Sequence, residues 1–203
     1  MVDLAQVAFV PNRCITENIV QAQEIAHSFK LMKRKKGFLG VKIDFQKAYD
    51  KMEWGFIQRV VRAFGFNEQF TNLIQQCLST VHYSLLLNGG ICPKFQLERG
   101  LRQGDPLSPY LFILGSEVLM HLINREIIQL KLTCIKPSRK APPISKLCYA
   151  DDIILFYKAS VTELSTLKEC LGKYCQYSKQ IINVEKSEVF PSKGIRPQFL
   201  NQI

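Results

Sequence analysis

The most constraining feature of this sequence is an apolar run from Leu147 to Phe156 with two adjacent aspartates, Asp151 and Asp152, at its centre. An unpaired carboxylate is costly to bury, and two side by side also repel each other. The residues on both sides are rich in Ile, Leu, Tyr and Phe, which favour β-strands. Because Asp is common in turns, the run predicts a β-hairpin with both carboxylates at its tip.

Two carboxylates at a hairpin tip suggest a bound cation. Hard oxygen ligands suit Mg²⁺ or Mn²⁺ better than Zn²⁺. The alternative is an ordinary Asp-Asp turn, in which the side chains only stabilise the bend. The run alone leaves both interpretations open.

The charge of the chain favours a polyanionic partner. The sequence has 203 residues, 47% of them hydrophobic, which is enough for the core of one domain or of a piece of a larger one. Its formal net charge of +10 favours nucleic acid ahead of an anionic membrane. A basic protein without such a partner is the alternative. The densest basic run, residues 33–36, ends a predicted helix, where cations are favourable in any case.

The cysteines indicate a reducing, intracellular compartment. There are seven of them, an odd number, and none forms a C-x-x-C motif. This argues against a closed disulfide framework. The sequence has no signal peptide and no apolar run long enough to span a bilayer, so we expect no membrane partner.

The hydrophobic periodicity predicts an α+β fold. Helices are expected over residues 15–36, 47–64, 68–80, 110–128 and 161–178. Strands are expected over residues 38–45, in a hairpin around the turn at 88–90, in the Asp-Asp hairpin, and in a final hairpin of 181–184 with 187–190. Thr16 and Thr162 are predicted N-caps. Helices and strands do not alternate strictly, which favours α+β over α/β.

Five blocks then give a family resemblance. They are residues 9–13 (FVPNR), 42–50 (KIDFQKAYD), 100–112 (GLRQGDPLSPYLF), 149–152 (YADD) and 182–187 (INVEKS). In this order the chain resembles the reverse transcriptase domain of a non-LTR (LINE-type) retrotransposon. Each block is a weak signal alone, but together they extend from Gln6 to about Phe190. Arg102 precedes the Gln-Gly pair of the third block, where group II intron and retroviral enzymes usually have Pro.

The resemblance implies a right-hand reverse transcriptase fold: a polymerase palm, with an antiparallel sheet backed by helices, and partial fingers. The expected division is 1–36 as partial fingers, 37–52 and 99–190 as palm, 53–98 as a fingers-side insertion, and 191–203 as the start of a connector to the thumb. The chain would then be one incomplete domain. The basic upstream fingers, the thumb and the endonuclease would be found elsewhere in a full-length element.

The resemblance also implies a two-metal nucleotidyltransferase. Asp44, Asp151 and Asp152 would be the catalytic, metal-binding triad, and the backbone carbonyl of Phe45 would be a further ligand. Transfer to a primer 3′-hydroxyl requires carboxylates from separate positions to converge on two ions, Mg²⁺ or Mn²⁺.

The nucleotide-binding residues implied by the resemblance come from two blocks. Tyr49 and Ala48 would contact the deoxynucleotide, with the Tyr49 ring excluding a 2′-hydroxyl; the alternative for Tyr49 is a core aromatic. Gln103 and Gly104 would line the pocket, since glycine permits close backbone approach. Further candidates are Arg13, Arg102 and Lys186. Of these, Lys186 would lie near the pyrophosphate.

The expected partners are an RNA template, a DNA primer and a dNTP, and the family resemblance implies a nuclear location. One alternative function is a catalytically inactive remnant that binds nucleic acid. Another is a different palm-type two-metal enzyme, such as a nucleotidyl cyclase, or more remotely a nuclease. A cyclase is expected to have a glycine-rich acidic hairpin, which residues 149–152 do not form.

Three positions depart from the family pattern. Asn12 and Lys179 stand where glycine is common. Asn tolerates a left-handed conformation, whereas Lys there would cost about 1 kcal/mol. Gly115 lies inside a predicted helix, at a cost of about 1 kcal/mol relative to Ala.

Overall fold

The computed structural model describes residues 2–32, 37–138 and 140–195. The helices are α1 (Ile15–Leu31), α2 (Ala48–Lys51), α3 (Trp54–Ala63), α4 (Glu68–Ser79), α5 (Ser108–Ile128) and α6 (Val161–Ser178). The strands are β1 (Phe38–Ile43), β2 (His82–Tyr83), β3 (Leu86–Leu87), β4 (Gly90–Ile91), β5 (Phe95–Gln96), β6 (Lys146–Tyr149), β7 (Asp152–Lys158) and β8 (Glu188–Pro191). The predicted α+β class is confirmed.

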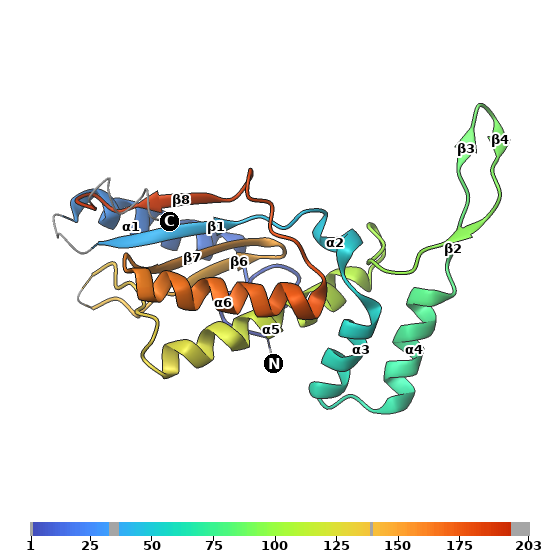
Figure 1. Ribbon diagram of the computed structural model, residues 1–203, viewed down its shortest axis with the longest axis horizontal. Coiled ribbons are helices and arrows are strands. Elements are labelled where there is room, and N and C mark those ends of the chain that lie inside the picture. The colour runs from blue at the N-terminus through green and yellow to red at the C-terminus, as the bar shows by residue number, and fades with distance from the viewer. Residues whose placement is uncertain (1, 33–36, 139, 196–203) are drawn as a thin grey trace.

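One four-stranded sheet forms the centre of the molecule, in the order β6-β7-β1-β8 (Figure 1). All three pairings are antiparallel. The sequence-distant strands β1 and β7 form the longest ladder, from Phe38 opposite Lys158 to Ile43 opposite Ile153. The predicted antiparallel palm sheet is therefore present.

Helices cover both faces of this sheet (Figure 1). Ile153, Leu155 and Tyr157 of β7 are buried in the main core, which also includes residues of α3, α5 and α6. Phe156 belongs to a second cluster with residues of α1, where its ring meets that of Phe29 edge-on at 6.3 Å. Successive residues of a strand point to opposite faces. A strand buried on both faces explains why the run after the two aspartates is continuously apolar.

Gly115 is required by close packing of helix α5. A Cβ atom at this position would lie 3.2 Å from the Met52 Cε and 3.3 Å from Phe56 Cε1. These distances are tighter than ordinary van der Waals contacts. The glycine that lowers helix propensity therefore lets α5 approach the segment that follows β1.

The helix expected over residues 47–64 is instead two helices, α2 and α3. Met52, between them, is extended, with φ −63° and ψ 119°. The backbone N–H groups of Gly100 and Leu101 donate to the carbonyls of Met52 and Tyr49, each over 2.8 Å. The prediction of one continuous helix is wrong because these bonds from a distant loop use carbonyls that a continuous helix would pair internally.

Both predicted threonine N-caps are also wrong. Cys14 is the N-cap residue of α1, without a side-chain hydrogen bond, and Thr16 lies inside the first turn. Ser160 caps α6, where its hydroxyl accepts a hydrogen bond from the Glu163 N–H over 3.2 Å, and Thr162 lies within the helix. A serine at this position satisfies an otherwise free N–H as well as a threonine does.

Two further boundaries differ from the prediction. Helix α1 ends at Leu31 rather than at residue 36, and the basic run at 33–36 lies outside the described residues. Residues 181–184 and 187–190 do not form the predicted ladder; one backbone hydrogen bond, from the Ser187 N–H to the Asn183 carbonyl over 2.9 Å, joins them. Instead β8 pairs with β1, and Ile182 forms a bridge with Phe45. The second edge of β1 has backbone groups that need partners, and these two segments supply them.

Two positions where the family commonly has glycine are left-handed. Asn12 has φ 63° and Lys179 has φ 60°. Lys179 is the C-cap residue of α6. Both residues therefore adopt the conformation that glycine favours, at the modest cost expected for Lys.

Helix α3 packs in the main core, whereas α4 and strands β2 to β5 extend away from the sheet (Figure 1). Strands β3 and β4 form a ribbon closed by Asn88 and Gly89, with φ 49° and 82°. The turn predicted at 88–90 is confirmed, since both central residues have the positive φ that such hairpins need. Within the described residues, no helix is both long and apolar enough to cross a lipid bilayer.

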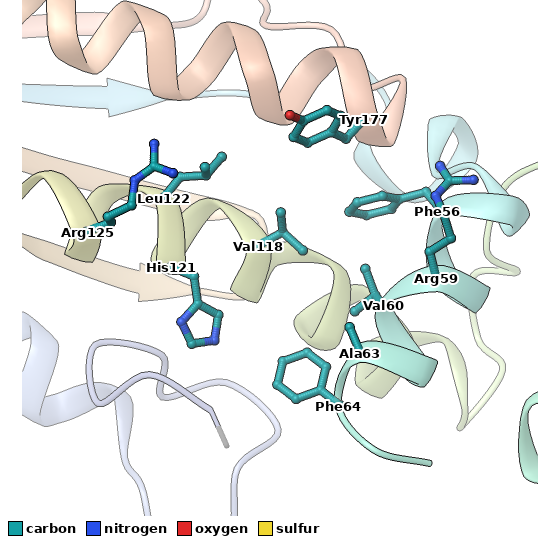
Figure 2. A pocket seen from close by; sticks show the side chains of 10 residues that line it. All are labelled: Phe56, Arg59, Val60, Ala63, Phe64, Val118, His121, Leu122, Arg125 and Tyr177. Carbon is teal, nitrogen blue, oxygen red and sulfur yellow. The ribbon is translucent and has the colours of Figure 1, made fainter. Parts of the chain in front are cut away.

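A cavity of about 500 Å³ lies between α3 and α5, near the end of α6 (Figure 2). Its lining is mostly apolar, with Arg59 and Arg125 toward opposite ends. The three aspartates predicted for catalysis are not among its ten lining residues. This cavity is therefore separate from the predicted site.

Gly115 of α5 and Gly172 of α6 should respond in opposite ways to substitution. Nothing lies within 4 Å of a Cβ built on Gly172 of α6. Gly172→Ala should raise the free energy of unfolding by about 0.5–1 kcal/mol through helix propensity. Gly115→Leu should lower it by about 1–3 kcal/mol through overpacking. Urea unfolding followed by circular dichroism measures both, and a neutral Gly115→Leu would contradict the close approach of α5.

Candidate active site

The hairpin of β6 and β7 ends in a two-residue turn. Tyr149 pairs with Asp152, so Ala150 and Asp151 form the turn itself. Ala150 is 6% exposed and has φ 53°, whereas Asp151 is exposed. The predicted hairpin tip is present, and it presents one carboxylate in the turn and one at the start of β7.

The third carboxylate reaches the same end of the sheet through strand register. Ile43 is opposite Ile153, so Asp44 and Asp152 occupy the next position of the β1–β7 pair. Opposed Cα atoms in antiparallel strands are about 4.5–5.5 Å apart. Ile43 and Ile153 face the main core, so the alternation of side chains directs Asp44 and Asp152 together to the other face.

Two of the three carboxylates act electrostatically on the third, Asp151. Partial burial raises the pKa of Asp151, and the negative charges of Asp152 and Asp44 raise it further. Burial likewise raises the pKa of Tyr49, with an added contribution from the Asp151 charge. The Tyr49 hydroxyl therefore lies within range of the Asp151 charge.

The carboxylates lie at the same end of the sheet, but their side chains are not arranged to coordinate one metal ion. Among residues 2–32, 37–138 and 140–195, no three His, Cys, Asp or Glu side chains stand in an arrangement that could already hold a metal ion. The like charges of the three carboxylates repel one another. Three carboxylates gathered at one place suit a hard divalent cation, which would remove this repulsion.

The backbone at Phe45 can add an oxygen to this donor set. Phe45 forms an antiparallel bridge with Ile182, beside which the Asn183 N–H donates to the Asp44 carbonyl over 2.8 Å. Along an antiparallel strand, neighbouring residues direct their backbone groups to opposite sides. The Phe45 carbonyl therefore faces the β7 side, where Asp152 lies.

Tyr49 is held by packing and by the loop before α5. Its ring stacks on Phe112 at 4.7 Å with an interplanar angle of 9°. A Cβ atom on Gly100 would lie 2.6 Å from the Asp50 carbonyl oxygen, and Gly100 has φ 93°. Only glycine therefore allows this loop to approach the segment that carries Tyr49. Gly100 begins the third sequence block but was not among the predicted site residues, because its close approach to Asp50 is a contact between distant segments.

The Gln-Gly pair lies in the same loop. Gln103 is exposed, and its side-chain N–H contacts the Asp50 carboxylate at 3.5 Å. Gly104 has φ 84°, and nothing lies within 4 Å of a Cβ built on it. Glycine is favoured at position 104 because of its positive φ, since a side chain there would meet no other part of the chain. The Arg102 guanidinium is exposed and pairs with Asp105 at 2.6 Å.

The other candidate residues are placed differently. Ala48 is buried, and its carbonyl accepts a hydrogen bond from the Gln180 side chain over 2.7 Å. Arg13 donates to the Gln6 carbonyl over 2.6 Å and to two other backbone carbonyls, which gives it a structural role. Lys186 is exposed in the segment before β8.

This geometry agrees with a comparison of the chain with known protein families. The family described as "Reverse transcriptase (RNA-dependent DNA polymerase)" matches residues 2–196. The chain belongs to the reverse transcriptase family.

Relatives of this reverse transcriptase chain are retroelement proteins. It is 26% identical over 193 residues to the "Transposon TX1 uncharacterized 149 kDa protein" of Xenopus laevis, covering 94% of this chain and 14% of that protein. It is 31% identical over 132 residues to the "Retrovirus-related Pol polyprotein from type-1 retrotransposable element R2" of Popillia japonica, covering 64% and 21%. The resemblance to non-LTR elements is confirmed. The chain spans only 14% and 21% of the length of these two relatives.

The fold is similar to that of telomerase from Candida albicans, solved in complex with a TWJ fragment of telomeric RNA. The TM-score is 0.65 at 12% identity, covering 95% of this chain and 33% of that one. At this identity the similarity shows the fold alone, and it confirms the reverse transcriptase fold.

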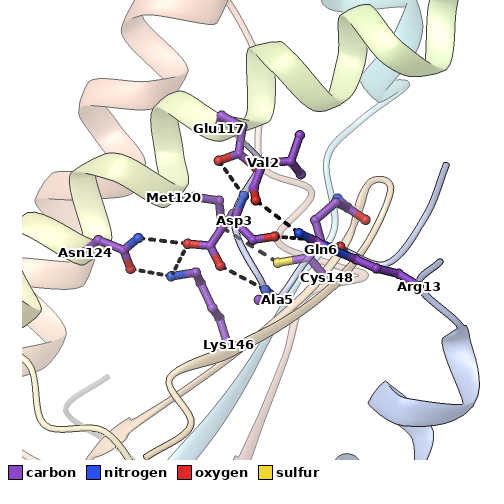
Figure 3. A network of polar contacts seen from close by, with 10 residues as sticks. All are labelled: Val2, Asp3, Ala5, Gln6, Arg13, Glu117, Met120, Asn124, Lys146 and Cys148. Carbon is purple, nitrogen blue, oxygen red and sulfur yellow. Dashed lines mark hydrogen bonds and ion pairs between the residues drawn. The ribbon is translucent and has the colours of Figure 1, made fainter. Parts of the chain in front are cut away.

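A buried polar network holds the N-terminal segment of the reverse transcriptase chain (Figure 3). The Asp3 carboxylate accepts a hydrogen bond from Asn124 over 2.8 Å and pairs with Lys146 at 3.1 Å. Its backbone N–H donates to the Glu117 carboxylate over 3.0 Å. Asn124 and Glu117 lie on α5, so the network joins the N-terminus to α5 and β6.

The pKa values of the two carboxylates of this network are shifted in opposite directions. Burial raises the pKa of Glu117 to about 7, and the Asp3 charge adds to this, while the Asp3 N–H and Lys146 act against it. Burial also acts to raise the pKa of Asp3, but the Ala5 N–H and the charge of Lys146 leave it below its ordinary value.

The free energy of unfolding should therefore fall as pH rises from the ordinary pKa of Glu117, 4.5, through its folded pKa of about 7. Its folded pKa of about 7 lies above the ordinary value of 4.5, so the folded state holds a proton that the unfolded state releases between these values. The free energy of unfolding should fall by roughly 2–3 kcal/mol between about pH 5 and pH 8, relative to Glu117→Gln. The opposite shift of Asp3 acts below this range. Urea unfolding at several pH values tests this, and parallel profiles for the two proteins would contradict it.

Proposed function

We propose that this chain is the palm of an RNA-directed DNA polymerase from a LINE-type retroelement. The observation that carries the proposal is the convergence of Asp44 with Asp151 and Asp152 at one end of the sheet, beside Tyr49. Family membership supports the same reaction class. Nucleotidyl transfer needs carboxylates from separate positions at one place, and the β1–β7 register provides this.

Asp44, Asp151, Asp152 and the Phe45 carbonyl would hold two divalent ions, Mg²⁺ or Mn²⁺. Such ions activate a primer 3′-hydroxyl and neutralise the triphosphate when they are bound. The protein would contribute four oxygen-bearing groups, all held at one end of the sheet. Carboxylates bind metal ions in their deprotonated form, so ion binding would compete with protons.

The dNTP would lie between Tyr49 and the loop with Gln103 and Gly104. The stack with Phe112 fixes the plane of the Tyr49 ring, so that it can exclude a ribose 2′-hydroxyl by contact. Ala48, the residue before Tyr49, is buried, and its contribution would be to the shape of the pocket floor. Lys186 is a further candidate near the pyrophosphate.

The RNA template and DNA primer have a matching surface next to the hairpin tip. A cavity of about 430 Å³ there is lined by Phe9, Tyr110 and Tyr149 among others. These three rings are 51%, 54% and 42% exposed. Exposed aromatic rings provide stacking surfaces for bases, and the net charge of +10 favours the phosphate backbone.

We assign residues 37–52 and 99–190 to the palm, 1–36 to partial fingers and 53–98 to a fingers-side insertion. Residues 191–203 would lead toward a thumb. Because the chain spans 14% and 21% of two retroelement relatives, other modules of a longer element would complete the grip on nucleic acid. The seven free cysteines favour action in a reducing compartment, and we propose the nucleus by family resemblance.

Asp151→Asn should abolish most primer extension. On poly(rA)–oligo(dT) with Mg²⁺ or Mn²⁺, we expect a loss of at least ~10²–10³-fold, by analogy with the removal of one preorganised charged group. RNA binding should change much less, because phosphate contacts come from Lys and Arg. Glu68→Gln is the matched control, since it removes an exposed carboxylate of α4 and should leave extension unchanged.

The outcomes separate the candidate functions. Equal loss of extension and RNA binding in Asp151→Asn would mean that Asp151 is structural. RNA binding without any extension, also after fingers and thumb from an intact relative are added, would identify a nucleic-acid-binding remnant. Extension without a template would indicate another two-metal palm enzyme.

Tyr49→Ala should relax sugar selection. The ratio of ribonucleotide to deoxynucleotide incorporation should rise, because the ring that contacts the sugar is removed. Tyr177→Ala, an exposed tyrosine near the end of α6, is the control and should keep the original ratio. If Tyr49→Ala is active with the ratio unchanged, Tyr49 is a core aromatic only.

A further inference from the structure

The turn that carries Asp151 is unfavourable on its own. Ala150 has φ 53°, in the left-handed region that favours glycine. It is also 6% exposed, and it lies in the turn beyond the last strand pair, Tyr149 with Asp152. Its backbone N–H and carbonyl therefore need partners from outside the hairpin, since each buried polar group left without one costs about 1–3 kcal/mol.

One side chain provides both partners. The Gln6 Oε1 accepts a hydrogen bond from the Ala150 N–H over 3.0 Å, and the Gln6 Nε2 donates to the Ala150 carbonyl over 3.3 Å. A glutamine amide has one acceptor and one donor side by side, as a neighbouring strand would. Gln6 thus closes the ladder at the residue where the hairpin has no further pairs.

Gln6 is itself held rigidly. It is 2% exposed, and its Oε1 also accepts the Ala8 N–H over 3.0 Å. Its backbone lies parallel to β6, bridged to Cys148, and its carbonyl accepts a hydrogen bond from Arg13 over 2.6 Å. The side chain therefore has one position available, with both ends of its amide in use.

The segment that carries Gln6 is anchored at a second point. Asp3, three residues earlier, is tied to α5 and to Lys146 of β6 by the buried network described above (Figure 3). The contact between Gln6 and Ala150 thus rests on an anchored strand-like segment along the edge of the sheet.

We propose that Gln6 is a positioning residue, which holds the Ala150 turn so that the Asp151 carboxylate meets Asp44 and Asp152 at the metal site. This inference rests on the proposed function, because it assumes that the three aspartates bind metal. Gln6 touches no reacting group and acts through the backbone of Ala150. A neutral amide suits the place, since Glu would lose the donor to the Ala150 carbonyl and add a fourth negative charge near the aspartates.

The test compares Gln6→Met with Asn18→Ala in the full 203-residue chain. Methionine keeps the length of the glutamine side chain but lacks the amide. Asn18 is the matched control, because its Nδ2 donates to the Cys148 and Ala5 carbonyls over 3.0 and 3.3 Å. It joins the same two segments without touching the turn.

Two readouts are independent of polymerase activity. Hydrogen exchange of the Ala150 amide, measured by NMR, should accelerate at least ~10-fold in Gln6→Met, because the amide loses its acceptor. Binding of Mn²⁺ alone, measured by electron paramagnetic resonance, should weaken about 10–100-fold, the range found when an outer-shell partner of a metal ligand is removed. In Asn18→Ala both quantities should stay within about twofold of the original, although thermal stability falls.

The possible results are distinct. Unchanged Mn²⁺ affinity in folded Gln6→Met, or equal weakening in Asn18→Ala, overturns the positioning role. Asp151→Asn is the reference, and if Mn²⁺ affinity does not fall in that variant, the proposed metal site itself is wrong. If Gln6→Met does not fold, the same readouts are taken on Gln6→Met with Ala150→Gly, compared with Ala150→Gly alone. Glycine removes the strain at φ 53°, and the same two losses are expected.

Discussion

The antiparallel pairing of β1 with β7 determines where every proposed catalytic group lies. The two strands are more than 100 residues apart in the chain, yet their register places Asp44 next to Asp152. A slip of one residue would turn each side chain to the opposite face and separate the carboxylates. The register is fixed because β7 is buried on both faces, between α1 on one side and α5 and α6 on the other. The apolar packing of the sheet therefore stabilises the position of the charges.

The rest of the site is built around this pair of strands by backbone contacts of other segments. The loop at Gly100 approaches so closely that it ends helix α2 after one turn, and this places Tyr49 on Phe112 beside the aspartates. On the opposite edge, Gln6 supports the turn before Asp151. The repulsion between the carboxylates opposes this convergence, so the surrounding hydrogen bonds and packing must outweigh it.

The local features of this arrangement were predictable from sequence, whereas the contacts between distant segments were not. The hairpin around Asp151 follows from alternation of strand and turn residues, and the left-handed Asn12 and Lys179 follow from positions where glycine is usual. The break at Met52 was not predictable, because it depends on hydrogen bonds from a loop about fifty residues later. The role of Gln6 was missed for the same reason, since nothing in its neighbours indicates a partner near residue 150. The pairing of β8 with β1 rather than with residues 181–184 also depends on which sheet edge is free.

The most direct test of this account is a crystal structure of the chain soaked with Mn²⁺, with the ions located by their anomalous scattering. We expect two peaks about 3.5–4 Å apart, between Asp44 and the Asp151–Asp152 pair, with one of them near the Phe45 carbonyl. Both peaks should disappear or weaken strongly in Asp151→Asn crystals. Full Mn²⁺ occupancy elsewhere on the protein with no peak at the three aspartates would contradict the account, because the register of β1 and β7 would then bring the carboxylates together without forming a metal site.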